Sequence, residues 1–278
     1  MELAYVNGDI MPIEDARVPI EDRGYQFGDA VYEYVASYNS RLFFLTQHMD
    51  RLTRSLRELS FSEDIRDGVE RGIRQLFAAA GISRAGIYIQ ISRGVEPRNH
   101  DYTTGIPVQT VMTARPLPDV HPHAETGVPV ITVPDIRWGR CDIKTVQLLP
   151  NVMAKHKALD RGVYDAVFVA ENGVVREATS SNVFMVKHNR VITHPLTTNI
   201  LPGITRQAII DIGKSTATEI EERFYTREEL LMADEVFLSG TTIDVLPVVN
   251  IDDKRIADGN VGSITQNIRR TLRKIIGA

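Results

Sequence analysis

Cysteine is almost absent from this chain of 278 residues, since Cys141 is the only one. A single cysteine excludes an intrachain disulfide and any zinc site built on a cysteine cluster, and it fits a reducing compartment. A basic excess is absent as well: 32 Lys and Arg residues stand against 36 Asp and Glu residues, for a net charge of −4 and a pI near 6.0. Nucleic-acid-binding proteins usually show the opposite balance, so no nucleic-acid partner is expected.

Long apolar runs are missing too. No stretch approaches the ~18 apolar residues that a membrane-spanning helix needs. The first ten residues carry Glu2 and Asp9 and no extended apolar segment, so they do not resemble a signal peptide. We therefore expect a cytoplasmic protein without a membrane partner.

Two familiar ligand-binding motifs fail on their spacing. The letters GKST at 213–216 resemble the end of a phosphate-binding P-loop, but the glycine that this motif requires five residues earlier is Ala208. His121 and His123 form an H-x-H pair with no third ligand nearby in the sequence, and a solvated pair in a linker explains them better than a metal does. The sequence therefore predicts no metal site.

Strand and helix patterns mix along the chain and predict an α/β (α+β) fold in two domains. The stretch 115–127 contains three prolines and little periodicity, so we place an interdomain linker at 117–124. This leaves a small N-terminal α/β domain at 1–116 and a larger C-terminal domain at 125–278, which carries Lys144.

Local signals predict several element boundaries. Alternating apolar residues around Asn7-Gly8 indicate a hairpin, and a helical pattern at about 67–80 ends at Gly81, a typical C-cap. We expect the last helix to use Ser263 as its N-cap. Its inward-facing residues are predicted from helical spacing to be Ile264, Ile268, Leu272 and Ile275.

The segment 140–162 contains Lys144, Lys155 and Lys157. Lys155 and Lys157 lie in a stretch of helix formers. Lys144 instead precedes an apolar run that begins at Val146, where a charged side chain rarely lies without a partner. Lys144 is therefore either a surface lysine with a buried stem or an amine with a chemical task.

Two fragments could bind phosphate. Pro202-Gly203 precedes a helix that begins with Ile204 and Thr205, and free N–H groups at a helix N-terminus bind anions. The stretch LSGTT at 238–242 could form a second side of the same site. Taken alone, the first fragment is better explained by an ordinary turn into a capped helix, and the second could be simply a turn.

Two further fragments could bind other charged groups. Glu177 lies at the end of an apolar strand and needs a cationic or hydrogen-bonding partner if it is buried; the alternative is a surface glutamate. Arg93, Arg98 and His100 gather in one loop, where an arginine fork could receive a carboxylate; the alternative is a solvated basic loop. A reactive lysine, a phosphate cradle and an acidic partner for a pyridine nitrogen are together what pyridoxal phosphate requires.

Seven segments in order resemble the fold-type IV pyridoxal-phosphate enzymes, which include branched-chain aminotransferases, aminodeoxychorismate lyases and D-amino-acid aminotransferases. These segments are EDRGYQFGDAVYE, HMDRL, SRGVEPRNH, IRWGRCDIKTVQLLPNVMAK, REATSSNVF, THPLTTNILPGITR and LSGTTIDVLPV. The likeness covers nearly the whole chain and is closest to the bacterial D-amino-acid (D-alanine) aminotransferases. It implies a larger C-terminal domain with a mixed, barrel-like sheet, and a homodimer with the active site shared between subunits.

The resemblance also assigns roles to single residues. Lys144 matches the lysine that holds pyridoxal 5′-phosphate as a Schiff base, whereas Lys155 and Lys157 match no functional position. The matching cofactor-binding positions are Arg51, Ile204, Thr205 and Thr241 for the phosphate, Glu177 for the pyridine nitrogen and Leu201 for the ring. The matching substrate-carboxylate positions are Tyr32, Arg98 and His100, the last two donated by the neighbouring subunit. The chain departs from the family at Gly240, where a serine is typical, and at Ala30, where a glycine is typical.

The implied activity is ping-pong transamination between a D-amino acid, such as D-alanine or D-glutamate, and a 2-oxo acid through a Lys144 aldimine. Within the same fold, a branched-chain L-amino-acid aminotransferase or an aminodeoxychorismate lyase is the alternative. Outside the family, the alternative is a Schiff-base lyase that uses Lys144 without a cofactor, in which case Glu177 and the phosphate cradle would have no role.

Overall fold

A computed structural model describes residues 2–61, 64–216 and 218–277. The chain forms two compact units, Met1–Pro118 with Ile143–Gln147, and Asp119–Asp142 with Leu148–Ala278. The division after Pro118 falls inside the stretch expected to be a linker. The sequence analysis assigned Lys144 to the C-terminal domain, but the segment that carries it packs with the first unit.

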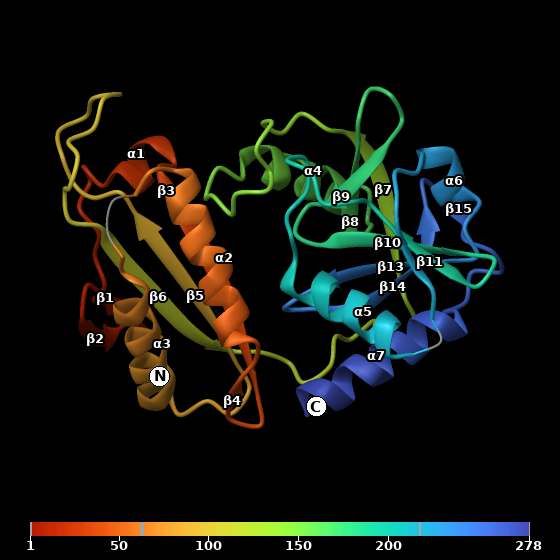
Figure 1. The fold of residues 1–278 in the computed structure, drawn as a ribbon, viewed down its shortest axis with the longest axis horizontal. Coiled ribbons are helices and arrows are strands. Elements are labelled where there is room, and N and C mark those ends of the chain that lie inside the picture. Colours follow the sequence, from red (N-terminus) through yellow and green to blue (C-terminus); the bar gives the residue numbers. More distant parts are fainter. Residues whose placement is uncertain (1, 62–63, 217, 278) are drawn as a thin grey trace. The chain divides into compact units, whose positions relative to one another are not determined.

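The first unit is built on an antiparallel six-stranded sheet with the order β2-β1-β6-β5-β3-β4 (Figure 1). Asn7 and Gly8, both with positive φ, make the predicted hairpin turn between its first two strands. The strands are β1 (Leu3–Val6), β2 (Asp9–Pro12), β3 (Ala30–Tyr38), β4 (Arg41–Leu42), β5 (Ala85–Ser92) and β6 (Gln109–Pro116).

Two helices, α2 (Leu45–Glu58) and α3 (Arg66–Ala80), cover one face of this sheet, and the short α1 (Arg23–Phe27) precedes β3. Apolar residues at helical spacing on α2 and α3 pack against alternate residues of β3, β5 and β6 in one buried cluster. Gly81, in the left-handed conformation, ends α3 as predicted.

The segment Ile143–Gln147 adds to the edge of this sheet beside β3. Tyr32 N donates to Lys144 O at 2.9 Å, and Val146 N donates to Ala30 O at 3.2 Å. The Ile143 side chain is buried in the same apolar cluster. These backbone bonds fix Lys144 next to Tyr32.

The second unit contains a nine-stranded mixed sheet, six strands of which close into a ring in the order β10-β13-β14-β7-β8-β9. The pairing of Asn182 with Glu177 closes the ring between β10 and β9, which confirms the barrel-like sheet. The ring strands are β7 (Val128–Pro134), β8 (Asp165–Val169), β9 (Val175–Ala178), β10 (Asn182–Lys187), β13 (Glu235–Gly240) and β14 (Asp244–Ile251). The outer strands are β11 (Arg190–Thr193), β12 (Ile220–Glu222) and β15 (Lys254–Arg255).

All six ring strands contribute side chains to one buried cluster, and β7, β10 and β13 do so with the two-residue period of a strand. The opposite faces of β7 and β8 pack against α4 (Leu149–Asp160). The other helices of the unit are α5 (Ile204–Ser215), α6 (Arg227–Leu231) and α7 (Ser263–Ile276).

The start of α7 differs from the prediction. Ser263 is the first helical residue and Gly262 is the N-cap, with no side-chain cap of its own. The carboxylate of Glu235 accepts from the backbone N–H groups of Ile264 and Thr265 at 3.1 and 2.7 Å instead. A Cβ at position 262 would lie 1.9 Å from the Glu235 carboxyl carbon, so this long-range cap requires glycine there.

The buried face of α7 is also rotated from the predicted one. It consists of Thr265, Ile268, Leu272 and Ile276, whereas Ile275 is 54 % exposed.

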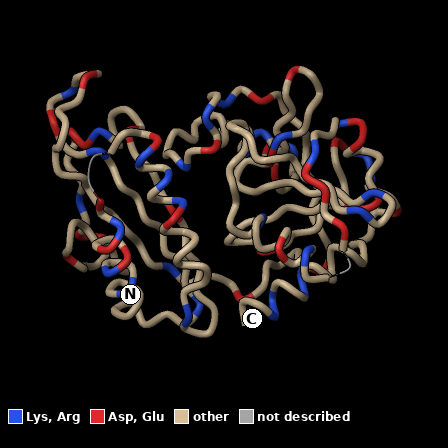
Figure 2. The backbone as a smooth tube through the Cα atoms, in the orientation of Figure 1, with Lys and Arg blue, Asp and Glu red and all other residues tan. Residues whose placement is uncertain are grey.

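Charged residues of both signs are interspersed along both units (Figure 2). Within the described ranges, none of the helices combines the length and apolar character needed to cross a membrane.

Candidate active site

Lys144 lies half-buried beside the sheet of the first unit. Its Nζ is 4.0 Å from the centroid of the Tyr32 ring, and its backbone N–H donates to Ser55 Oγ at 3.3 Å. Among the described residues, no carboxylate forms an ion pair with this amine. The other two lysines differ: Lys155 Nζ donates to Tyr164 O and lies 3.7 Å from Asp165, and Lys157 is exposed.

Arg51 is buried in the same unit and binds a buried carboxylate. Its Nε and Nη2 donate to the two oxygens of Glu33 at 2.7 and 2.8 Å. His48 Nδ1 lies 2.7 Å from Glu33 Oε2. Burial alone would raise the pKa of Glu33, but the charge and hydrogen bonds of Arg51 hold that pKa well below its usual range. Burial also lowers the pKa of His48, so a neutral His48 donates to the ionised Glu33.

Arg98 and His100 both lie on the loop between β5 and β6, and both are exposed. The Arg98 guanidinium stacks over the Phe27 ring at 4.4 Å, and the His100 ring lies 5.7 Å from that ring. The structure therefore brings these two predicted carboxylate ligands together on one aromatic side chain.

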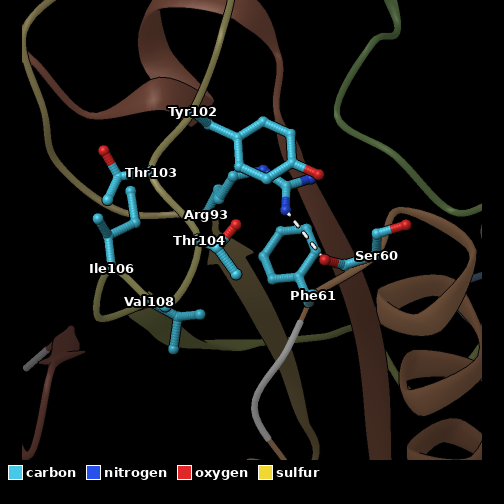
Figure 3. Close-up of a pocket in the computed structure, with 9 residues that line it drawn as sticks. Ser60, Phe61, Arg93, Tyr102, Thr103, Thr104, Ile106 and Val108 are labelled. Atoms are coloured by element: carbon cyan, nitrogen blue, oxygen red, sulfur yellow. Dashed lines mark hydrogen bonds between the residues drawn. The ribbon is translucent and has the colours of Figure 1, made fainter.

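Arg93, the third basic residue of this loop, is not solvated. Its guanidinium lies between the rings of Phe61 and Tyr102, at 4.4 and 4.0 Å (Figure 3). It donates to Leu59 O at 2.7 Å and to Ser60 O at 3.3 Å, at the end of α2. Arg93 therefore anchors the loop to the end of α2 and is not available as a solvated ligand-binding group.

In the second unit, Glu177 is buried on β9 and bonded to an arginine. Arg137 Nη1 donates to Glu177 Oε1 at 2.6 Å. The same guanidinium donates to both oxygens of Asp135 and lies 4.3 Å from the Phe168 ring centroid. The alternative of a surface glutamate is wrong, because Glu177 is only 6 % exposed. The Arg137 guanidinium therefore lies between two carboxylates and holds Glu177 in place.

The other Glu177 oxygen connects it to the strand that closes the ring. Asn182 Nδ2 and Leu201 N donate to Glu177 Oε2 at 3.1 and 3.0 Å, and Asn182 Nδ2 also donates to Leu201 O at 2.9 Å. Asn182 pairs with Ser239 on its other side. Glu177, Asn182 and Ser239 thus form a row across three adjacent strands, each spaced by about 4.8 Å.

The N-terminus of α5 has the features of an anion site. Its N-cap, Gly203, provides no side-chain cap, and a Cβ there would lie 2.1 Å from Asn182 Oδ1, so only glycine allows this approach. Thr205 is buried in the first turn. Ser181 Oγ and Ser239 Oγ are buried polar atoms without a hydrogen-bond partner among the described residues. Buried hydroxyls near uncapped N–H groups fit a bound phosphate.

The two departures from the family have different surroundings. A Cβ at Gly240 would have no neighbour nearer than Ile243 Cγ1 at 3.4 Å, with Ser181 Cβ at 3.7 Å, so there is room for a side chain. Ala30 is completely buried. Its methyl lies 3.2 Å from the point that a Cβ would occupy if Gly24 on α1 had a side chain. The Ala30 methyl therefore packs beneath α1.

Sequence reasoning missed Glu33, His48, Arg137 and Asn182. Glu33 had a signal, because it falls between Val31 and Val35 on the apolar face of a strand with a two-residue period. A carboxylate at such a position is buried and must have a partner.

Among the residues that the structure describes, no three His, Cys, Asp or Glu side chains gather as a metal site.

The family Amino-transferase class IV matches residues 30–251. The chain is 41% identical over 274 residues to D-alanine aminotransferase of Bacillus licheniformis, covering 97% of this chain and 95% of the relative. It is 39% identical over 280 residues to D-alanine aminotransferase of Staphylococcus epidermidis, covering 99% and 98%.

Solved structures agree with this fold. The branched-chain amino acid aminotransferase from Escherichia coli has a TM-score of 0.89 and 26% identity, covering 99% of this chain and 94% of that one. The branched-chain aminotransferase from Thermoproteus uzoniensis has a TM-score of 0.89 and 27% identity, with the same coverage. A match that spans most of the chain, together with relatives near 40% identity over almost its full length, leads to one conclusion: the chain belongs to the class IV aminotransferases.

Proposed function

We propose that this protein is a D-amino-acid aminotransferase that uses pyridoxal 5′-phosphate. It would move an amino group between a D-amino acid and a 2-oxo acid, and we expect D-alanine and D-glutamate to be its preferred amino donors. The observation that carries the proposal is the Lys144 amine, which lies against the Tyr32 ring and has no carboxylate partner among the described residues. A lysine amine without a carboxylate partner is available to form a Schiff base with a carbonyl group.

The residues present fit this cofactor. Ile204, Thr205 and Thr241 would bind its phosphate together with Arg51, whose guanidinium provides a charge-assisted contact. The hydroxyls of Ser181 and Ser239 support this assignment, because they are buried without partners in the described structure. Leu201 would pack against the ring. When bound, pyridoxal phosphate provides the electron sink that makes the α-carbon acidic.

Two residues would direct the chemistry. Lys144 would carry the proton of the reaction at its Nζ, accepting it from the substrate α-carbon as general base and releasing it again as general acid. Glu177 would face the pyridine nitrogen with a carboxylate that three donors from Arg137, Asn182 and Leu201 hold in place. This negative group would keep the nitrogen protonated and so maintain the electron demand of the ring.

Tyr32, Arg98 and His100 would bind the substrate α-carboxylate, the arginine by a charge-assisted bond. We propose a homodimer in which the neighbouring subunit donates Arg98 and His100. The exposed apolar residues Leu149, Val152 and Met153 on α4 support association, since such a stripe on a helix is typical of a protein interface.

The single cysteine supports a cytoplasmic location.

The alternatives are less well supported. The branched-chain enzymes among the matching solved structures are 24–27% identical to this chain, whereas the D-alanine aminotransferases are 39–41% identical. A cofactor-independent lyase would have no use for the buried Glu177 or for the hydroxyls beside α5.

A half-reaction screen tests the proposal. The purified protein with bound cofactor is mixed with single D- or L-amino acids, without a 2-oxo acid, and the change of the cofactor absorbance band is followed. We expect D-alanine and D-glutamate to convert the cofactor fastest. Faster conversion by L-leucine or L-valine would instead identify a branched-chain enzyme, and release of pyruvate from aminodeoxychorismate a lyase.

A further inference from the structure

Arg23, on α1, is a buried arginine that none of the proposed catalytic roles uses. It is 3 % exposed. Its guanidinium donates to three successive backbone carbonyls of the β5–β6 loop, those of Asn99, His100 and Asp101, at 2.8, 3.3 and 3.1 Å. It also donates to Glu96 Oε1 at 2.9 Å. One side chain therefore holds this loop at the backbone of Asn99, His100 and Asp101 and, before Arg98, at the Glu96 side chain.

Phe27 lies one helical turn after Arg23, on the same face of α1. Its ring carries the Arg98 guanidinium at 4.4 Å and the His100 ring at 5.7 Å, and Arg23 lies 4.8 Å from its centroid. Arg98 also donates to Gln26 O at 3.3 Å. Arg23 thus holds the loop backbone, and Phe27 holds the two side chains.

A second arginine secures the base of the same loop. Asp29 Oδ2 accepts from both Arg23 Nε at 3.1 Å and Arg93 Nε at 2.8 Å. Tyr102 stacks over Arg93 at 4.0 Å and lies 5.7 Å from Arg23. Because Asp29 and Glu96 balance the two guanidinium charges, the cluster can remain buried without a net charge.

We propose that Arg23 and Phe27 are positioning residues for substrate carboxylate recognition, acting through Arg98 and His100. The inference rests on the carboxylate-binding role assigned to these two residues in the proposed function. Exposed side chains such as Arg98 and His100 gain binding strength when they are held before the ligand arrives, because less conformational freedom is lost on binding. The two α1 residues would provide this restraint through their contacts with the loop, and would not contact the substrate themselves.

The test compares two amines in the half-reaction of the holoenzyme. D-Alanine carries a carboxylate, and ethylamine does not. We expect Arg23→Lys and Phe27→Leu to raise the KM for D-alanine about tenfold or more, while the rate constant for ethylamine in single turnover changes less than about twofold. An equal loss with both amines, or no loss with D-alanine, would overturn the inference.

Arg84→Lys is the matched control. Arg84 is also buried in the first unit, stacks on Tyr38 at 3.7 Å and donates to a backbone carbonyl, that of Ser37. Within the described part of the chain, its side chain makes no hydrogen bond or ring contact with the β5–β6 loop. It should leave the KM for D-alanine unchanged, and a rise equal to that of Arg23→Lys would overturn the inference. Thermal melting checks that each variant is folded. If Arg23→Lys does not fold, Phe27→Leu decides the question, because Phe27 is only half-buried.

A double-mutant cycle separates this inference from the proposed function. In an Arg98→Ala background, Phe27→Leu should have a smaller effect on the KM for D-alanine than in the unmodified protein. If Arg98→Ala alone leaves that KM unchanged, the carboxylate-binding role fails and the inference fails with it. If Arg98→Ala raises the KM and Phe27→Leu does not, only the inference fails.

Discussion

Glu177 and Asn182 face each other across the one residue pair that joins β9 to β10, and a side-chain hydrogen bond of 3.1 Å links them. Asn182 also donates to Leu201 O at 2.9 Å, so the same amide connects the segment before α5 to Glu177. The position of Glu177 therefore depends on closure of the strand ring and not only on its local loop.

Lys144→Ala should reduce turnover by about 10²–10⁴-fold or more, because it removes the proposed general base. It should also remove the protein-bound label that borohydride reduction leaves on the chain. Lys157→Ala is the control, since Lys157 is exposed and should keep both properties. Peptide mass mapping of the reduced protein identifies the labelled lysine, and a label that persists in Lys144→Ala would disprove the assignment.

Glu177→Gln should retain the fold and the cofactor but lose most activity. The glutamine keeps the size of the side chain, whereas the negative charge opposite the pyridine nitrogen is lost. Asp135→Asn is the comparison, because Asp135 contacts the other side of Arg137 and Glu177 stays in place. We expect a much smaller loss for Asp135→Asn. Equal activity of Glu177→Gln and the unmodified protein, with the same spectrum, would remove Glu177 from the site.

Arg51→Ala should weaken cofactor retention, measured as the cofactor left after dialysis. It also leaves Glu33 buried without its cation, which costs about 3–5 kcal/mol of stability for a buried pair. The double variant Glu33→Gln with Arg51→Ala should recover part of that stability and still lose cofactor. Recovery of both would mean that Arg51 is structural only.

Gly240→Ser should slow the loss of cofactor during dialysis by adding a hydroxyl beside Ser181. The nearest atom to the new Cβ would be 3.4 Å away, so the side chain fits without moving its neighbours. The melting temperature without cofactor should stay the same. A dissociation rate equal to that of the unmodified protein would place Gly240 outside the phosphate site.

His194 should make the protein less stable in mild acid. Arg176 Nη1 lies 2.8 Å from Nε2, and Nδ1 lies 2.7 Å from Pro195 O; since arginine can only donate, Nε2 accepts and the ring is neutral. Burial and then the nearby charges of Arg176 and Arg206 lower the pKa of His194 from 6.5 to about 4.

In the unfolded chain, His194 therefore binds a proton below pH 6.5, whereas in the folded protein it binds one only below about pH 4. Above pH 6.5 the titration of His194 costs the folded protein little. As the pH falls below that value the free energy of unfolding decreases, by about 2 kcal/mol at pH 5. His194→Gln, whose amide oxygen can still accept from Arg176, should reduce this loss in urea unfolding at pH 7 and pH 5. The same loss in both proteins would contradict the assignment.

Local patterns in the sequence were enough to predict the hairpin at Asn7-Gly8, the end of α3 at Gly81 and the mixture of strands and helices. Each of these depends on a backbone preference of a few neighbouring residues. The start of α7 was not predictable in this way, because its cap, Glu235, is 29 residues away from Ile264.

The candidate site follows the same rule. The alternation in β3 indicates that Glu33 is buried, but its partner Arg51 lies 18 residues away on a helix. Arg137 is 40 residues from Glu177, and nothing between them in the sequence indicates that they meet. The family resemblance suggested the functional positions, whereas the groups that hold them in place required the three-dimensional structure.

Because of the segment Ile143–Gln147, the first unit is made from two separate stretches of the polypeptide chain. An expression fragment that stops at Pro118 would leave the β3 edge without the partner that Lys144 and Val146 provide, and an unpaired edge favours aggregation. A fragment that starts at Asp119 would carry Ile143 without the apolar cluster that buries it. During synthesis, the first unit likewise remains unfinished until Gln147 has left the ribosome, by which time β7 of the second unit has already been made.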